Sequence, residues 1–164
     1  AGKSRRGLNM SRFNSSEAGW NLIFGAWFVT LIATFGSLFF SEIMKFPPCV
    51  LCWYQRICMY PLVLLFLAGM FPLDKRVWRY SLPLALFGWL IALYHNLLHY
   101  GIVPESASPC VQGVPCSTVY INWAGFITIP ILSLFSFSII LILLTLFLKR
   151  IKNEKSFEKF VIFV

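Results

Sequence analysis

Charged residues are scarce in this chain of 164 residues, where they make up 12%, against about a quarter in an average soluble domain. Hydrophobic residues reach 59%, aromatic residues 18%, and the mean hydropathy is +0.76. A soluble domain of this size cannot hide so much apolar surface, because a large part of it stays in contact with water. Disorder is excluded as well, since disordered chains are poor in aromatic residues. The composition therefore indicates an integral membrane protein.

Motifs of several enzyme classes are also missing. The sequence has no Gly-rich phosphate-binding loop and no pair of catalytic carboxylates, so nothing in it indicates nucleotide-dependent or hydrolytic chemistry. The alternation of apolar and polar residues that is typical of a transmembrane β-barrel strand is absent too. Any apolar segment that crosses the membrane must then be a helix, because lipid offers no partner to an unpaired backbone.

Four apolar runs are long enough to be such helices. They cover about 22–40, 49–71, 80–98 and 126–148. Each is close to the roughly 20 residues that cross a hydrocarbon core of about 30 Å. The predicted fold is therefore an all-α, integral membrane four-helix bundle.

The 14 Lys and Arg give a net charge of +8 without forming one basic patch. Twelve of them lie in three segments between or beyond the runs: Lys3, Arg5, Arg6, Arg12; Lys75, Arg76, Arg79; and Lys149, Arg150, Lys152, Lys155, Lys159. This spacing is typical of membrane topology and not of nucleic-acid binding, and it predicts that both termini are cytoplasmic. The chain divides into a basic N-terminus (1–19, with 1–9 resembling an added extension), a membrane domain (20–148) and a basic tail (149–164).

Four of the five cysteines fall on the opposite, outer side in this topology. Cys49 and Cys52 begin the second run, and Cys110 and Cys116 lie in the long connection after the third. Disulfides persist on the outer side of a membrane. A zinc site built from both pairs is the competing interpretation, but thiols in an oxidising compartment tend to be lost as disulfides, so no metal is expected.

The first pair has the surroundings of a reactive thiol. Pro47 and Pro48 suit the first turn of a helix, which places Cys49 and Cys52 at its positive end, where a thiolate is stabilised. Arg56 follows Cys52 by four residues and so lies on the same helix face, one turn deeper. An Arg at membrane depth usually marks a functional site, although an isolated one can also extend to the lipid headgroups.

The remaining candidates leave alternatives open. Turn-forming residues between Cys110 and Cys116 allow their sulfurs to meet, either as a static staple or as one half of a disulfide relay. Cys58 is expected to be a small buried apolar residue. His95 and His99 share one face at the outer end of the third run, which suits a pair of interfacial polar caps as well as a shared site.

Three segments resemble the DsbB family of disulfide-bond-forming membrane oxidoreductases, and most closely its short BdbC-like branch. They read PPCVLCWYQRICMYPL, PCVQGVPC and YINWAGFITIP. The resemblance implies a four-helix bundle in the bacterial cytoplasmic membrane that takes electrons from a soluble thioredoxin-like thiol oxidase. It implies a membrane quinone, ubiquinone or menaquinone, as the electron acceptor.

The resemblance also implies a role for each site residue. Cys110 and Cys116 match the pair that exchanges with the soluble partner, and Cys49 and Cys52 match the pair next to the quinone. Cys52 is then the thiolate at the quinone ring, with Arg56 supporting both, and His95 matches a quinone-side histidine. The five-residue spacing from Cys110 to Cys116 departs from the longer segment of the best-known DsbB proteins, so the exchange intermediates between the pairs can differ.

Three other functions fit parts of the sequence, and one feature speaks against each of them. A vitamin K epoxide reductase-like enzyme would carry its loop cysteines ahead of the active pair, whereas here they follow it. A small tetraspan assembly protein with static disulfides leaves Arg56 unexplained. A transporter would need polar or broken helices at mid-membrane, and the first and fourth runs contain no charge.

Overall fold

The computed structural model describes residues 2–71, 73–104, 109–110 and 128–163, with side chains from Glu17 to Asn153 within those ranges. In this part of the chain the order is α1 (Gly2–Leu38), a π-helical turn (Phe39–Ile43), α2 (Val50–Met70), α3 (Trp78–His99) and α4 (Ile129–Phe163). Four segments of these helices are long and apolar enough to cross a membrane: Glu17–Ile43, Val50–Met70, Trp78–His99 and Ile129–Asn153. The predicted all-α membrane bundle is confirmed.

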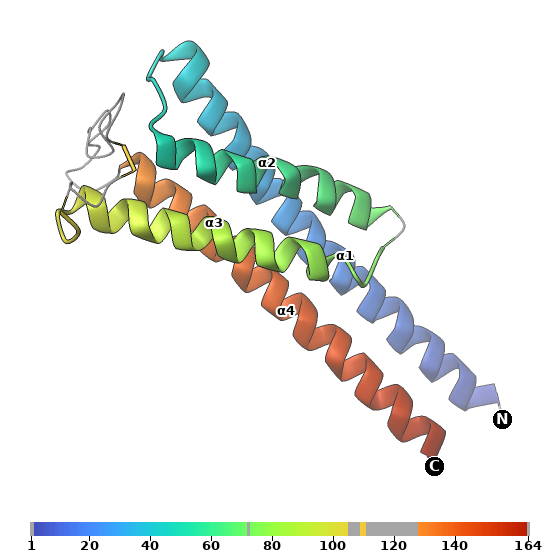
Figure 1. Ribbon diagram of the computed structural model, residues 1–164. Helices are drawn as coiled ribbons and strands as arrows, with labels where there is room; N and C mark the ends of the chain where they lie inside the picture. Colours follow the sequence, from blue (N-terminus) through green and yellow to red (C-terminus); the bar gives the residue numbers. More distant parts are fainter. Residues whose placement is uncertain (1, 72, 105–108, 111–127, 164) are drawn as a thin grey trace.

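The four helices close into a ring. Helices α1 and α3 each pack against both α2 and α4. Both termini lie at one end of the bundle, and the beginning of α2 and the end of α3 lie at the other (Figure 1). Large apolar side chains such as Phe28, Phe35, Ile57 and Phe87 are exposed on the outside of the ring, where lipid would cover them.

The core combines large side chains on three helices with a stripe of small ones on α3. Ser81, Ala85 and Ala92 of α3 are fully buried, and Gly88 lies between them on the same face. A Cβ atom added to Gly88 would overlap the Phe137 ring of α4. Small residues let membrane helices approach closely, so Gly88 determines how near α3 and α4 lie.

Gly88→Ala is therefore expected to destabilise the bundle by about 1–3 kcal/mol, the usual cost of overpacking a core. The measurement is the midpoint of thermal unfolding in detergent. Gly25→Ala on α1 is the matched control, because its Cβ would meet Leu143 of α4 at an ordinary 3.6 Å. Equal midpoints for the two variants would show that the α3–α4 contact can relax.

Candidate redox site

The first cysteine pair lies where the chain turns into α2. Phe46 to Pro48 precede the helix, so the two prolines lie just ahead of its first turn rather than within it. Cys49 is the N-cap residue, with extended backbone angles (φ −71°, ψ 170°), and its carbonyl accepts a hydrogen bond from the Trp53 N–H (3.2 Å). Both sulfurs are thus held at the positive end of the helix, as the sequence predicts.

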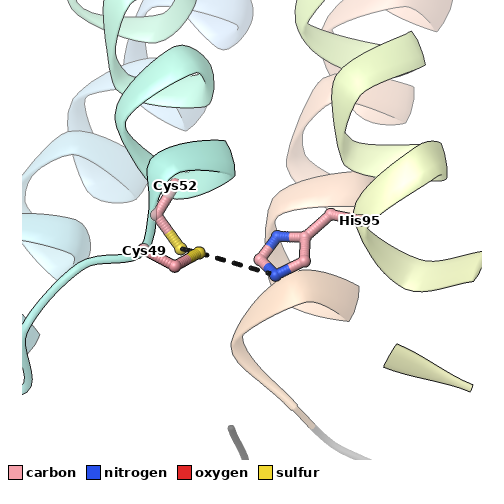
Figure 2. Close-up of side chains that lie close together, drawn as sticks. All are labelled: Cys49, Cys52 and His95. Atoms are coloured by element: carbon pink, nitrogen blue, oxygen red, sulfur yellow. Dashed lines mark hydrogen bonds between the residues drawn. The ribbon is translucent and has the colours of Figure 1, made fainter. Parts of the chain in front are cut away.

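The two sulfurs lie against each other and against a histidine ring from α3. The Sγ atoms of Cys49 and Cys52 are 3.0 Å apart, and Nε2 of His95 is 3.8 Å from the Cys49 Sγ (Figure 2). The pKa of Cys49 is lowered to about 4, chiefly by the hydrogen bond with Cys52 and in smaller part by His95, while burial opposes both effects. At neutral pH the reduced pair therefore holds one negative charge, which the hydrogen bond shares between the two sulfurs.

One ligand atom each from Cys49, Cys52 and His95 falls within 4.8 Å of the others, a grouping that a soft metal ion could use. However, two sulfurs bound to one tetrahedral zinc ion at about 2.3 Å stay roughly 3.8 Å apart. The separation of 3.0 Å is shorter than that. The pair is therefore arranged more like a dithiol about to close than like a metal site.

Arg56 is held by the end of α1. Its Nε donates to the Ser37 Oγ (2.8 Å), its Nη2 donates to the Ser37 carbonyl (2.9 Å), and its guanidinium lies 5.4 Å from the centre of the Trp53 ring. These contacts fix a positive charge in the wall of the cavity that Cys52 also lines. Ser37 is a site residue that the sequence analysis missed, because nothing in the first apolar run indicates which of its residues faces α2.

His95 is nearly inaccessible, at 2% exposure, and Gln55 of α2 contacts its second ring nitrogen. The side-chain amide nitrogen of Gln55 lies 3.2 Å from Nδ1 of His95. Gln55 is not among the site residues predicted from the sequence, although a polar residue three positions after Cys52 in an apolar run is a visible signal. His99 lines the same cavity, but its ring packs edge-on against Tyr100, with 5.6 Å between centroids.

These side chains surround a cavity of about 430 Å³, a size typical of small-molecule sites. Its polar lining includes Ser37, Cys49, Cys52, Gln55, Arg56 and His95. Its other lining is mostly apolar and comes from α1 and α4, including Ile32, Leu132 and Phe135. These three are also exposed on the outside of the bundle, so the cavity reaches the lipid-facing surface between α1 and α4.

The second pair is described at one of its two residues. Cys110 is disulfide-bonded, whereas Cys49, Cys52 and Cys58 are free thiols. Cys110 packs against the small cluster of Cys49, Leu51 and Leu98, as Cys52 does, so this half of the loop pair lies beside the first pair. Cys116 lies outside the described residues. Cys58 is 6% exposed within the main core, as expected of a small buried apolar residue.

Comparison with known proteins agrees with this geometry. A sequence family described as "Disulfide bond formation protein DsbB" matches residues 17–147. Disulfide bond formation protein C of Bacillus subtilis (strain 168) is 52% identical over 134 residues, which cover 82% of this chain and 94% of that protein. A probable disulfide formation protein of Metapseudomonas resinovorans is 42% identical over 132 residues, covering 80% and 92% of the two chains.

No solved structure matches the chain. The family match spans most of the membrane domain and includes the pair Cys49 and Cys52 together with Arg56 and His95. The chain belongs to the DsbB family, and it is a multi-pass membrane oxidoreductase that forms disulfide bonds.

Proposed function

We propose that this protein reoxidises a soluble thioredoxin-like thiol oxidase and passes the electrons to a membrane quinone, ubiquinone or menaquinone. The observation that carries the proposal is the position of the Cys49–Cys52 pair in the polar wall of a cavity that reaches the lipid-facing surface. A quinone is a lipid-soluble oxidant with a polar ring and an apolar tail. The polar wall suits the ring, and the apolar lining between α1 and α4 suits the tail.

The overall reaction balances in electrons and protons. The dithiol of the partner reduces the Cys110–Cys116 disulfide, and exchange with the first pair then leaves Cys49 and Cys52 reduced. Closing the Cys49–Cys52 disulfide releases two electrons and two protons, which convert one quinone into one quinol. The packing of Cys110 against the cluster that contains Cys49 favours exchange between the pairs without a large movement.

The two sulfurs of the first pair have different neighbours, which supports a division of labour between them. Both sulfurs line the cavity, but Cys49 faces His95 and belongs to the cluster against which Cys110 packs, whereas Cys52 lies one helical turn from Arg56 on the same face of α2. In this arrangement Cys49 exchanges with the loop pair and Cys52 meets the quinone. The positive charge of Arg56 supports the Cys52 thiolate and the negative charge that develops on the quinone oxygen.

The proposal is tested by quinone reduction in liposomes that contain the purified protein and a membrane quinone. A reduced thioredoxin-like oxidase added outside should be oxidised at the rate at which quinol appears, with one disulfide per quinol. Partner oxidation that continues unchanged in liposomes without quinone would contradict it.

The proposed topology places the chain in the bacterial cytoplasmic membrane, with both termini in the cytoplasm and the four paired cysteines on the outer face. An impermeant thiol reagent applied to intact, reduced cells should therefore label Cys110 or Cys116. The buried Cys58, in the core of the bundle, should stay unlabelled. If the paired cysteines were labelled only after lysis, they would lie on the cytoplasmic side, and the proposed orientation would be wrong.

A further inference from the structure

Gln55 is a buried amide, 8% exposed, on the cavity-facing side of α2. It lies three residues after Cys52, close to one helical turn, so it points to the same side as the pair. Its amide nitrogen is 3.2 Å from Nδ1 of His95. An amide –NH₂ group can only donate a hydrogen bond, so Nδ1 must accept it.

This contact decides where the neutral His95 ring carries its proton. When Nδ1 accepts, the proton of the neutral ring sits on Nε2. Nε2 is the nitrogen that faces the Cys49 sulfur, at 3.8 Å (Figure 2). Gln55 thus orients His95 beside the thiol of Cys49. Enzymes with a nucleophilic thiol use a third residue in the same way, to orient the histidine that contacts the thiol.

We propose that Gln55 is a positioning residue that keeps His95 protonated on Nε2, so that His95 donates a hydrogen bond to the sulfur of Cys49. This inference deepens the proposed function, on which it rests. When a loop thiolate attacks a mixed disulfide between Cys49 and the other loop cysteine, its electron pair forms the new loop S–S bond. The electron pair of the broken bond leaves on Cys49, and the Nε2–H of His95 stabilises that thiolate.

A stabilised leaving thiolate departs faster, so Gln55 would speed the return of the loop pair to its oxidised state. The other ionisable groups that line the cavity are Cys52, Arg56 and Tyr60 of α2 and His99 of α3. Helices α1 and α4 contribute only hydroxyl and apolar groups to its described lining. A substitution of Gln55 is therefore expected to act on Cys49 through the ring proton of His95.

The first test reads the tautomer directly in the full chain by ¹⁵N NMR of labelled histidine in micelles, above the pH at which the imidazolium deprotonates. His99→Gln assigns the two rings. Wild-type His95 should carry its proton on Nε2. Gln55→Glu should move it to Nδ1, because a carboxylate only accepts. A proton on Nδ1 in the wild type, or the same tautomer in both chains, would overturn the proposal without requiring any variant to be active.

The second test titrates the thiolate absorbance of Cys49 in full chains where Cys52 and Cys58 are Ala and Cys110 and Cys116 are Ser. Gln55→Met should raise the midpoint by about one pH unit, a tenfold fall in the ratio of thiolate to thiol at a given pH. Leu62→Met is the control, because Leu62 is fully buried on α2 and does not line the cavity. An unchanged midpoint in Gln55→Met would refute the role. Neither test needs quinone or partner, so this inference can fail while the proposed function stands.

Discussion

Arg56→Met is expected to lower kcat/KM for the quinone by about 10²-fold, the scale of losing one preorganised donor to a developing anion. Met fills much of the same volume, but it removes the fixed charge beside Cys52 and the donors that can reach a quinone oxygen. Arg56→Lys keeps a charge but loses the planar fork, so about a tenfold loss is expected. Turnover of the purified variants against quinone concentration measures both effects.

Ser37→Ala is the graded control for Arg56. It removes the hydroxyl that accepts from Nε and leaves the carbonyl that accepts from Nη2, so the guanidinium keeps its charge and one of its two anchors. A loss smaller than that of Arg56→Lys is expected. Wild-type kinetics in Arg56→Met would mean that Arg56 only ties α2 to α1.

Cys110→Ser is expected to abolish oxidation of the soluble partner, since the loop pair can then no longer form its disulfide. A small dithiol that reaches the first pair directly should still drive quinone reduction in this variant, because Cys49 and Cys52 are intact. The measurement compares quinol formation with the protein partner and with the small dithiol as donor.

Cys58→Ala is the matched control, because it removes a thiol that is buried in the core and leaves both redox pairs intact. It should retain activity with both donors. Loss of both activities in Cys58→Ala would assign that thiol a redox role. Full activity of Cys110→Ser with the protein partner would show that the partner meets the first pair without the loop.

The helices themselves follow closely from the sequence. A hydrocarbon core imposes length and composition on every span, so the four runs predict four helices to within a few residues at most ends. The same holds for Cys49, Cys52 and Arg56, whose shared face follows from helix periodicity along α2. Local spacing is sufficient wherever the partners lie on one helix.

Contacts between helices are harder to predict from one sequence. Ser37 and Arg56 are 19 residues apart, and Gln55 and His95 are 40 apart, so only the packing of α1, α2 and α3 brings them together. The π-helical turn at Phe39–Ile43 is equally hidden in the sequence. Its Phe39 carbonyl accepts from the N–H of Met44 (3.1 Å), one residue beyond the α-helical spacing, and Lys45 follows with φ 57°.

His95 and His99 show the limit of helix periodicity most clearly. Both lie on one face of α3, and both line the cavity. Only His95 has a ring nitrogen 3.8 Å from the Cys49 sulfur, because His99 lies one turn nearer the end of the helix, where its ring packs against Tyr100. The sequence favours His95, and the spatial arrangement supplies a reason for it.

The most direct measurement mixes the reduced Cys110→Ser, Cys116→Ser double variant with one equivalent of quinone in the absence of oxygen. Quinol, remaining thiols and the visible spectrum are then followed in a single turnover. The expected result is one quinol formed and two thiols lost per protein. A transient visible band should appear as the Cys52 thiolate contacts the ring, and it should be absent in Cys52→Ser. A quinone that stays oxidised while Cys49 and Cys52 both remain titratable would contradict electron transfer from this pair to a quinone.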